Sequence, residues 1–192
     1  MPVGNEIDQV YFPLSGMISL LAVLREGKAI ETSTIGSNGV FGAEVAFGLF
    51  ESGIRAIVQI PMSAATITAP LFRRTAANSE AIRLVAIRYN EVLLAQARIS
   101  AACNALHSIE ARFCRWLLQT TKVSGSKTVT LTQEFLSEML GVRRTSITEV
   151  ASKLQAAGLI NYSRGVINIL DVPALRKLSC ECFEILQERQ AI

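Results

Sequence analysis

The stretch that specifies this fold covers residues 130–170 and reads TLTQEFLSEMLGVRRTSITEVASKLQAAGLINYSRGVINIL. Thr132 can cap a helix that ends at Leu140, because a threonine hydroxyl accepts a hydrogen bond from a free backbone N–H at a helix start. Gly141 then allows the left-handed turn that separates two helices. A second helix is expected over 143–157, so the segment predicts a helix-turn-helix.

A short hairpin is expected directly after the second helix. Gly158 ends that helix, and the apolar segments 159–162 and 166–169 are separated by the polar turn Ser163-Arg164-Gly165. Two β-compatible segments around such a turn are typical of a two-stranded hairpin. The whole stretch therefore predicts a winged helix.

The exposed start of the second helix carries the residues that point to a function. A recognition helix enters the major groove of DNA through its N-terminal end, where long donors or small hydroxyls contact bases and phosphates. A solvated helix face would use similar residues, but helix, glycine turn, helix and hairpin in one short stretch favour DNA binding. The candidate DNA contacts are Thr132, Arg143, Arg144, Thr145, Ser146, Thr148 and, in the hairpin, Arg164.

The charge distribution agrees with a nucleic-acid partner. Residues 1–107 contain 8 Lys or Arg and 8 Asp or Glu, whereas residues 108–192 contain 11 and 8. All of the net charge of +3 therefore lies in the C-terminal part. Phosphate backbones attract such a surface.

Composition argues against several other classes of protein. Hydrophobic residues make up 50% of the chain and charged residues 18%, which is typical of a globular protein. The sequence shows neither an apolar run of about 18 residues nor a secretory signal, so we expect a cytoplasmic protein without a membrane partner. The chain has one histidine, His107, no glycine-rich phosphate loop and no nucleophile elbow. We therefore expect no enzyme activity, no cofactor and no metal.

The first part of the chain predicts β structure. Gly27 and the segment 36–39 provide turns between short apolar strands. Short strands with regular turns indicate a small barrel or sandwich, which we assign to a sensor-like domain over 1–77. The expected strands cover residues 10–12, 17–24, 29–35, 54–60 and 64–68.

A long helix is expected over 78–107, after Pro70 in the first turn of a helical segment. About 28 residues would span some 42 Å, which is long for packing on a small barrel. A dimerisation helix is therefore the preferred interpretation, and packing on the chain's own barrel is the alternative. The predicted seam, with coiled-coil-like spacing, is Val85, Tyr89, Val92, Gln96, Ile99 and Cys103.

Six segments of the chain resemble the Crp/Fnr family of bacterial transcription regulators. In the helix-turn-helix these are 132–136, 139–147 and 154–160; upstream they are 11–16, 39–42 and 112–118. The resemblance covers nearly the whole chain. It implies an α+β protein with an N-terminal cyclic-nucleotide-binding-like β-barrel, a long dimerisation helix and a winged helix-turn-helix over 108–192. It also implies a homodimer that binds a two-fold DNA operator and contacts RNA polymerase.

The chain departs from the family pattern in the barrel. The family has further residues before the first strand, so the barrel is expected to be incomplete, either as a fragment or through a misassigned start. Cyclic-nucleotide binders of the family carry Gly-Glu and then Arg-Ser or Arg-Thr, whereas this chain has Glu44 after an intervening alanine, and Arg55 followed by Ala56. Glu44 and Arg55 are candidates for an effector pocket, with an ordinary surface pair as the alternative. Iron–sulfur members need N-terminal cysteines, and no cysteine precedes Cys103.

In the recognition helix, the resemblance assigns Arg144 to the arginine that reads guanine. Thr145 replaces a glutamate of the best-known members, so a different operator is expected. Arg143 stands where a capping serine is common, and we expect it to contact a phosphate.

The remaining cysteines are interpreted as structural. Cys180 and Cys182 are expected on one helix that starts near Pro173, where residues two apart point to different faces. A redox or metal pair is the alternative. His107 is expected at a helix end or an interface.

The sequence thus predicts a homodimeric, sequence-specific transcription regulator of the Crp/Fnr type. One alternative is a cyclic-nucleotide-responsive member of the same family. Another is a ligand-binding or scaffold protein that uses its winged helix for protein contact. The effector, the operator, and activation or repression stay open.

Overall fold

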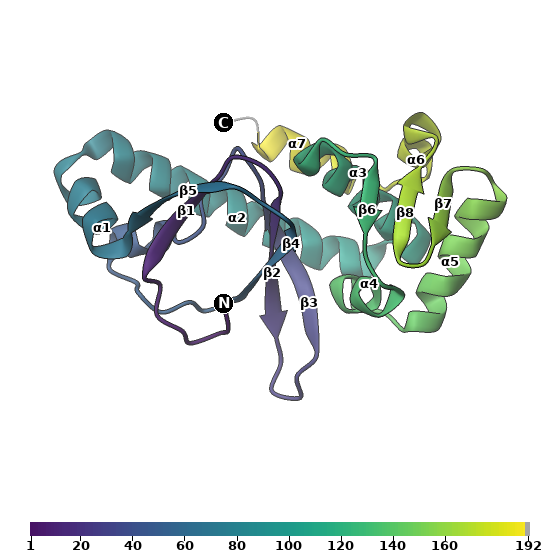
Figure 1. Cartoon of the computed structure of the whole chain (residues 1–192), viewed down its shortest axis with the longest axis horizontal. Helices are drawn as coiled ribbons and strands as arrows, with labels where there is room; N and C mark the ends of the chain where they lie inside the picture. Colours follow the sequence, from purple (N-terminus) through teal and green to yellow (C-terminus); the bar gives the residue numbers. More distant parts are fainter. Residues whose placement is uncertain (191–192) are drawn as a thin grey trace.

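A β-rich half and a helical half are joined by one long helix in the structure, a computed structural model that describes residues 1–190 (Figure 1). The β-rich half lies on the left of Figure 1 and the helical half on the right. In residues 1–190, no helix is long and apolar enough to cross a membrane.

The five strands of the β-rich half lie where the sequence predicts them. Gly27, at φ 82°, forms the turn of one hairpin. One sheet pairs β1 with β5, and the other has the strand order β3-β2-β4; all neighbouring strands are antiparallel. The strands are β1 (Gln9–Pro13), β2 (Met17–Val23), β3 (Ala29–Ile35), β4 (Arg55–Ile60) and β5 (Ala64–Thr68).

The predicted barrel is corrected to two open sheets. Within residues 1–190, β3 and β4 are the outer strands of their sheet and do not pair with β1 or β5. A barrel closes only when every strand has two paired neighbours. Helices cover the apolar faces instead: a 3₁₀ helix, η1 (Ala43–Phe47), and α1 (Ala69–Asn78) join a core that includes Val10.

The predicted long helix is confirmed as α2 (Glu80–Leu106), which has 27 residues. Ser79 separates it from α1, because the serine hydroxyl caps α2 by accepting a hydrogen bond from the N–H of Ile82. Pro70 lies in the first turn of α1, where its missing N–H is tolerated.

Most of the predicted dimer seam packs against the chain itself. Gln96 is buried, and its side chain hydrogen-bonds the N–H and the C=O of Thr34 at 3.0 and 3.2 Å. Tyr89 packs against the β-rich core, Ile99 against buried Cys103, and Val92 is also buried, whereas Val85 is 62% exposed. A helix on a sheet and a helix in a coiled coil need nearly the same apolar spacing, so the pattern could not separate the two.

The helical half has the predicted helix-turn-helix and hairpin, with a third strand beside the hairpin. Phe113 and Trp116 form the centre of its core. The three strands have the order β6-β8-β7, and β6 was not foreseen. The elements are α3 (Ile109–Ser124), β6 (Thr128–Thr130), α4 (Gln133–Leu140), α5 (Arg144–Ala156), β7 (Ile160–Ser163), β8 (Val166–Ile169), α6 (Val172–Leu178) and α7 (Cys182–Gln190).

The C-terminal helix is not continuous, contrary to the sequence-based expectation. α6 ends at Leu178, and α7 begins at Cys182. Cys180 lies between them in non-helical chain. Helical geometry therefore does not keep the side chains of the two cysteines apart.

Polar contacts along β3 join the two halves. Trp116 Nε1 donates to Glu31 Oε1 at 3.0 Å, and Ser19 Oγ donates to Glu31 Oε2 at 2.6 Å. Gln119 donates to the hydroxyl of Thr34 at 2.8 Å. Burial raises the pKa of Glu31 to about 7, although the hydroxyl of Ser19 and the charge of Arg115 act in the opposite direction.

Replacing Glu31 with glutamine should remove a pH-dependent part of the stability. The pKa of Glu31 is about 7 in the folded protein and 4.5 ordinarily, so the folded state holds the proton more tightly. Its stabilising contribution is full below pH 4.5 and is lost as the pH rises through 7. As the pH rises from 4.5 to 7, the wild-type melting temperature should therefore fall relative to that of Glu31→Gln, as measured by circular dichroism.

The matched control is Glu26→Gln in the exposed hairpin turn, which should keep the wild-type pH profile. Equal profiles for wild type and Glu31→Gln would contradict the role given to the buried carboxyl group.

Candidate nucleic-acid interface

The turn of the helix-turn-helix is fixed by local chemistry and by contact with the β-rich half. Thr132 caps α4 by accepting a hydrogen bond from the N–H of Phe135 at 3.2 Å, as predicted. Gly141 ends α4 at φ 62°, and a Cβ atom there would lie 2.6 Å from Cδ1 of Ile30 in β3. Glycine is thus required by both the turn and the close approach of β3.

The first turn of α5 projects its side chains outward. Arg143 is the N-cap residue, and its side chain makes no capping bond to the described chain. Arg144 and Thr145 are exposed, while Ile147 on the opposite face is fully buried. Burial of that inner face therefore fixes which side chains α5 presents outward.

An open hollow of about 520 Å³ gathers three of the predicted contacts, Thr132, Arg144 and Arg164. The residues Gln133, Glu134, Tyr162 and Gly165 also line it. The hairpin is held beside α4 because the hydroxyl of Tyr162 donates to the carbonyl of Leu131 at 2.9 Å. The starts of α4 and α5 and the hairpin turn therefore form one concave surface.

Two of the predicted contacts are less available than the arginines. Ser146 is half-buried. Thr148 is exposed, but its hydroxyl lies 2.9 Å from the side-chain oxygen of Gln133 and 3.1 Å from the carbonyl of Arg144. Sequence reasoning did not single out Gln133, although its place just after the α4 cap marks it as a helix-start residue.

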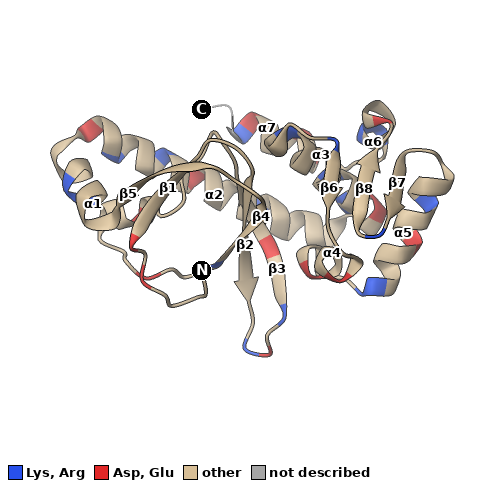
Figure 2. Cartoon of the chain, viewed as in Figure 1, with Lys and Arg blue, Asp and Glu red and all other residues tan. Residues whose placement is uncertain are grey.

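Positive charge lies at the start of α5 and at the hairpin turn, and acidic residues lie on the neighbouring α4 (Figure 2). Arg164 adopts φ 50° in the turn, beside Gly165 at φ 78°. Arg143 lines a neighbouring hollow together with Lys28 of the β2–β3 hairpin and Glu138. Arginine donors therefore border the concave surface on two sides.

The candidate effector residues do not meet in the structure. Glu44 lies in η1 and lines a pocket of about 330 Å³ beside α2. Burial raises the pKa of Glu44. Arg55 does not line this pocket; its guanidinium lies 3.7 Å from the carboxylate of Glu138 in α4. Glu44 and Arg55 were paired only by their place in the sequence motif. The motif gives no information about Glu138 of α4, which is the partner of Arg55 in the structure.

Residues 111–178 match the family model of the Crp-like helix-turn-helix domain. This part of the chain is a Crp-like helix-turn-helix domain. The match begins inside α3 and ends with α6, so it includes the whole concave surface. The predicted resemblance to the Crp/Fnr family is confirmed.

The chain as a whole has the fold of solved Crp/Fnr regulators. FixK2 from Bradyrhizobium japonicum is 15% identical with a TM-score of 0.77, over 93% of this chain and 90% of FixK2. A CRP-family transcriptional regulator from Thermus thermophilus is 19% identical with a TM-score of 0.75, over 92% and 90%. A protein from Eubacterium rectale assigned to the Crp/Fnr family is 21% identical with a TM-score of 0.71, over 90% and 81%. No curated protein sequence matches the chain.

Cyclic AMP should not bind tightly to this protein. Ala56 offers no hydroxyl to a cyclic phosphate, and the pocket beside α2 contains Glu44 and Glu51 but, among the described residues, no lysine or arginine. Loss of a hydrogen bond to a charged group costs about 1.5–3 kcal/mol, and two carboxylates also repel phosphate. Isothermal titration calorimetry should show no binding with a dissociation constant at or below about 1 µM; binding at that strength would refute this view of the pocket.

Proposed function

We propose that the chain is a sequence-specific DNA-binding regulator of transcription that acts as a homodimer and not as an enzyme. The observation that carries the proposal is the outward first turn of α5, where Arg143, Arg144 and Thr145 adjoin a hollow shared with Arg164 of the hairpin. Such a regulator acts in the cytoplasm and works with RNA polymerase.

The geometry supports different roles for Arg144 and Arg143 in the DNA complex. With the N-terminal end of α5 in the major groove, Arg144 reaches a base edge, where its guanidinium can pair with O6 and N7 of guanine. Arg143, one residue nearer the turn, contacts a phosphate. The start of α4 at Thr132 offers free backbone N–H groups to a second phosphate, and Arg164 follows the adjacent backbone.

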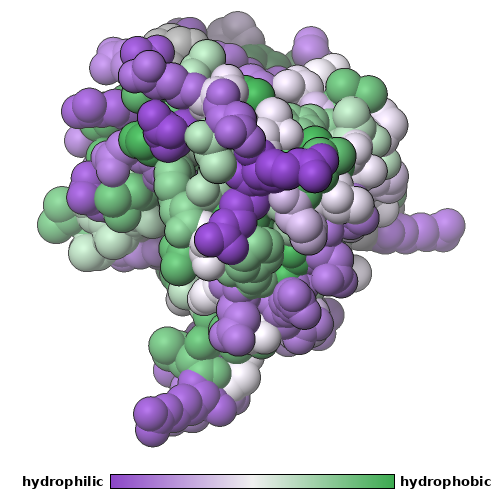
Figure 3. All heavy atoms as spheres, turned by 90° about the vertical axis from the view of Figure 1, so that its left-hand side faces the viewer, coloured by the Kyte–Doolittle hydropathy of each residue, from purple (hydrophilic) through white to green (hydrophobic). Residues whose placement is uncertain are grey.

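The proposed homodimer uses a different face of α2 from the predicted seam. Leu84, Ile87 and Leu94 are each 40–44% exposed, and they share this face with Glu91 and Arg98 at alternating steps of three and four residues. The end of the molecule formed by α1 shows apolar surface among hydrophilic side chains (Figure 3). A second copy is the partner that suits this face, since pairing two α2 helices presents two recognition helices to a two-fold DNA site.

The first test of the proposal compares the two arginines at the start of α5. Arg144→Ala should weaken binding to the DNA sequence that the wild type selects from a random pool by about 1–3 kcal/mol per half-site. It should also relax the choice of base at one position in each half-site. Binding curves on selected and scrambled duplexes measure both effects.

Arg143→Ala is the matched variant. It should weaken binding to selected and scrambled DNA about equally. The slope of the logarithm of the binding constant against the logarithm of the salt concentration should fall by about one phosphate contact per subunit. If Arg144→Ala also weakened both duplexes equally, Arg144 would not read a base, and the assigned register of α5 would fail.

The proposed dimer face is tested by introducing charge. Ile87→Glu and Leu94→Glu place like charges opposite each other across a two-fold pair and should convert a dimer into a monomer, as measured by light scattering. Leu71→Glu, an equally exposed leucine on α1, is the control and should leave the mass unchanged. A monomeric wild-type chain at micromolar concentration would contradict the dimer itself.

A further inference from the structure

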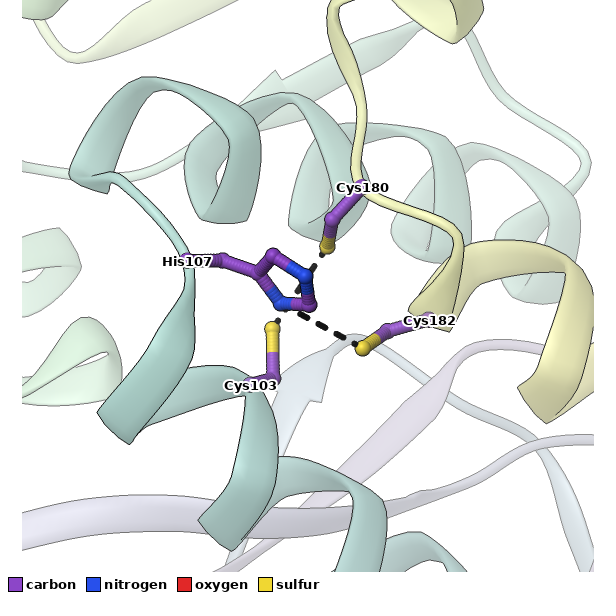
Figure 4. Close-up of side chains that lie close together, drawn as sticks. All are labelled: Cys103, His107, Cys180 and Cys182. Atoms are coloured by element: carbon purple, nitrogen blue, oxygen red, sulfur yellow. Dashed lines mark hydrogen bonds between the residues drawn. The ribbon is translucent and has the colours of Figure 1, made fainter.

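Four potential metal ligands that are far apart in the sequence converge at the joint between α2 and α7 (Figure 4). Cys103 belongs to α2, and His107 caps its C-terminal end. Cys180 lies in the segment before α7, and Cys182 is the first residue of α7. Their ligand atoms all lie within 4.8 Å of one another. Figure 4 shows the four side chains pointing toward a common centre.

We propose that these four side chains bind one zinc ion as a tetrahedral Cys₃His site. Zinc–sulfur and zinc–nitrogen bonds of about 2.3 and 2.0–2.1 Å place tetrahedral ligands about 3.6–3.8 Å apart. The Sγ atoms of Cys103 and Cys180 are separated by 3.6 Å, and so are Sγ of Cys182 and Nδ1 of His107. The three cysteines are buried, as expected for a closed structural zinc site.

The histidine is oriented as a metal ligand. Its Nδ1 faces the sulfur atoms, while its Nε2 lies 3.4 Å from a carboxylate oxygen of Glu181. A proton on Nε2 donated to that carboxylate leaves the lone pair of Nδ1 directed at the centre. Zinc-bound histidines are commonly held by a carboxylate on the second ring nitrogen in this way.

The charge around the site also suits a zinc ion with three thiolates, which together carry a charge of −1. Two buried arginines of α3, Arg112 and Arg115, act electrostatically on the cysteines. Neither has a carboxylate salt bridge in residues 1–190: Arg112 donates to the carbonyl of Leu140, and Arg115 to the side-chain oxygen of Gln119.

Other uses of the cysteines fit the geometry less well. A disulfide between Cys103 and Cys180 would need a separation of about 2.05 Å, and it would leave the convergence of Cys182 and His107 unexplained. An iron–sulfur cluster distributes its thiolates over several irons and needs ligands that are further apart. A single tetrahedral ion uses all four side chains.

The position of the site indicates what the ion would do. Cys103 and His107 precede the Crp-like domain of residues 111–178, and Cys180 and Cys182 follow it. One ion would therefore tie both ends of this domain together beside Ser108, the residue that caps α3 after α2. Zinc should fix the joint about which the helix-turn-helix could otherwise turn relative to α2.

The test uses the full chain, reduced and stripped of metal with a chelator. Elemental analysis after adding zinc and removing the excess should give one ion per chain. Cobalt should give the absorption bands of a tetrahedral thiolate complex, and zinc should displace it. Zinc should also raise the melting temperature, because the ion binds only the folded arrangement. No bound ion, a Cys103–Cys180 disulfide that persists under reduction, or iron with inorganic sulfide in the isolated protein would overturn the proposal.

Ligand variants locate the ion. Cys180→Ser and Cys182→Ser should each weaken zinc affinity by more than about 100-fold, beyond the effect of a residue that only orients a ligand. The matched control is Cys114→Ala, a buried cysteine of α3 outside the cluster, which should keep one zinc per chain. Unchanged zinc binding in both serine variants would overturn the assignment.

Glu181→Gln keeps the test decisive if the serine variants fail to fold. The side chain of Glu181 is 72% exposed, so the fold does not depend on it. Zinc affinity should fall by about 10–100-fold while the far-ultraviolet circular dichroism stays that of the wild type. An unchanged affinity would contradict the role given to the His107–Glu181 pair in holding Nδ1 toward the ion.

Discussion

The paired hydrogen bonds between Gln96 and the backbone of Thr34 determine how the long helix lies on the β-rich half. The side-chain amide both accepts from and donates to one residue of β3, as a neighbouring strand would. Both groups of Thr34 are buried, so an apolar side chain at 96 would leave each without a partner, at a cost of about 1–3 kcal/mol per group. The register of α2 on β3 is therefore specified by a polar contact inside an otherwise apolar stripe.

The position of the helix-turn-helix follows from the same strand. Thr34 receives a hydrogen bond from Gln119 of α3, Glu31 receives one from Trp116, and Ile30 contacts Gly141 at the end of α4. The start of α5 is thus held relative to β3 through α3 and α4. Any change that shifts β3 against α2 would also move the recognition helix, which gives the β-rich half a direct mechanical connection to the proposed DNA surface.

Elements that depend on local chemistry could be predicted from the sequence. Gly27, Gly141 and Gly165 each adopt positive φ where a turn was expected, and the strands and helices between such turns lie close to their predicted bounds. Thr132 caps α4 as predicted, and Arg143 occupies the cap position of α5. These features need only neighbouring residues, so the pattern of the sequence specifies them.

Features that depend on distant partners could not be predicted. The apolar stripe of α2 is compatible with a dimer seam or with a sheet, and only the three-dimensional position of β3 decides between them. The Cys103–Cys180 contact joins residues 77 positions apart, and no local pattern predicts that the end of α2 approaches the segment before α7. A signal was present nevertheless: Cys103 and His107 are four residues apart, which places two metal-ligating side chains on one face of a helix.

The central claim is that the start of α5, the start of α4 and the hairpin turn form one DNA-reading surface. Amide hydrogen exchange of the full chain, with and without the duplex it selects from random DNA, tests this most directly. Exchange should slow at residues 132–134, 142–149 and 163–165. The exchange rates of β1, β2, β4 and β5 should stay unchanged, and any change in the β-rich half should be limited to β3. Unchanged exchange in those three segments, with protection confined to the β-rich half, would contradict the account.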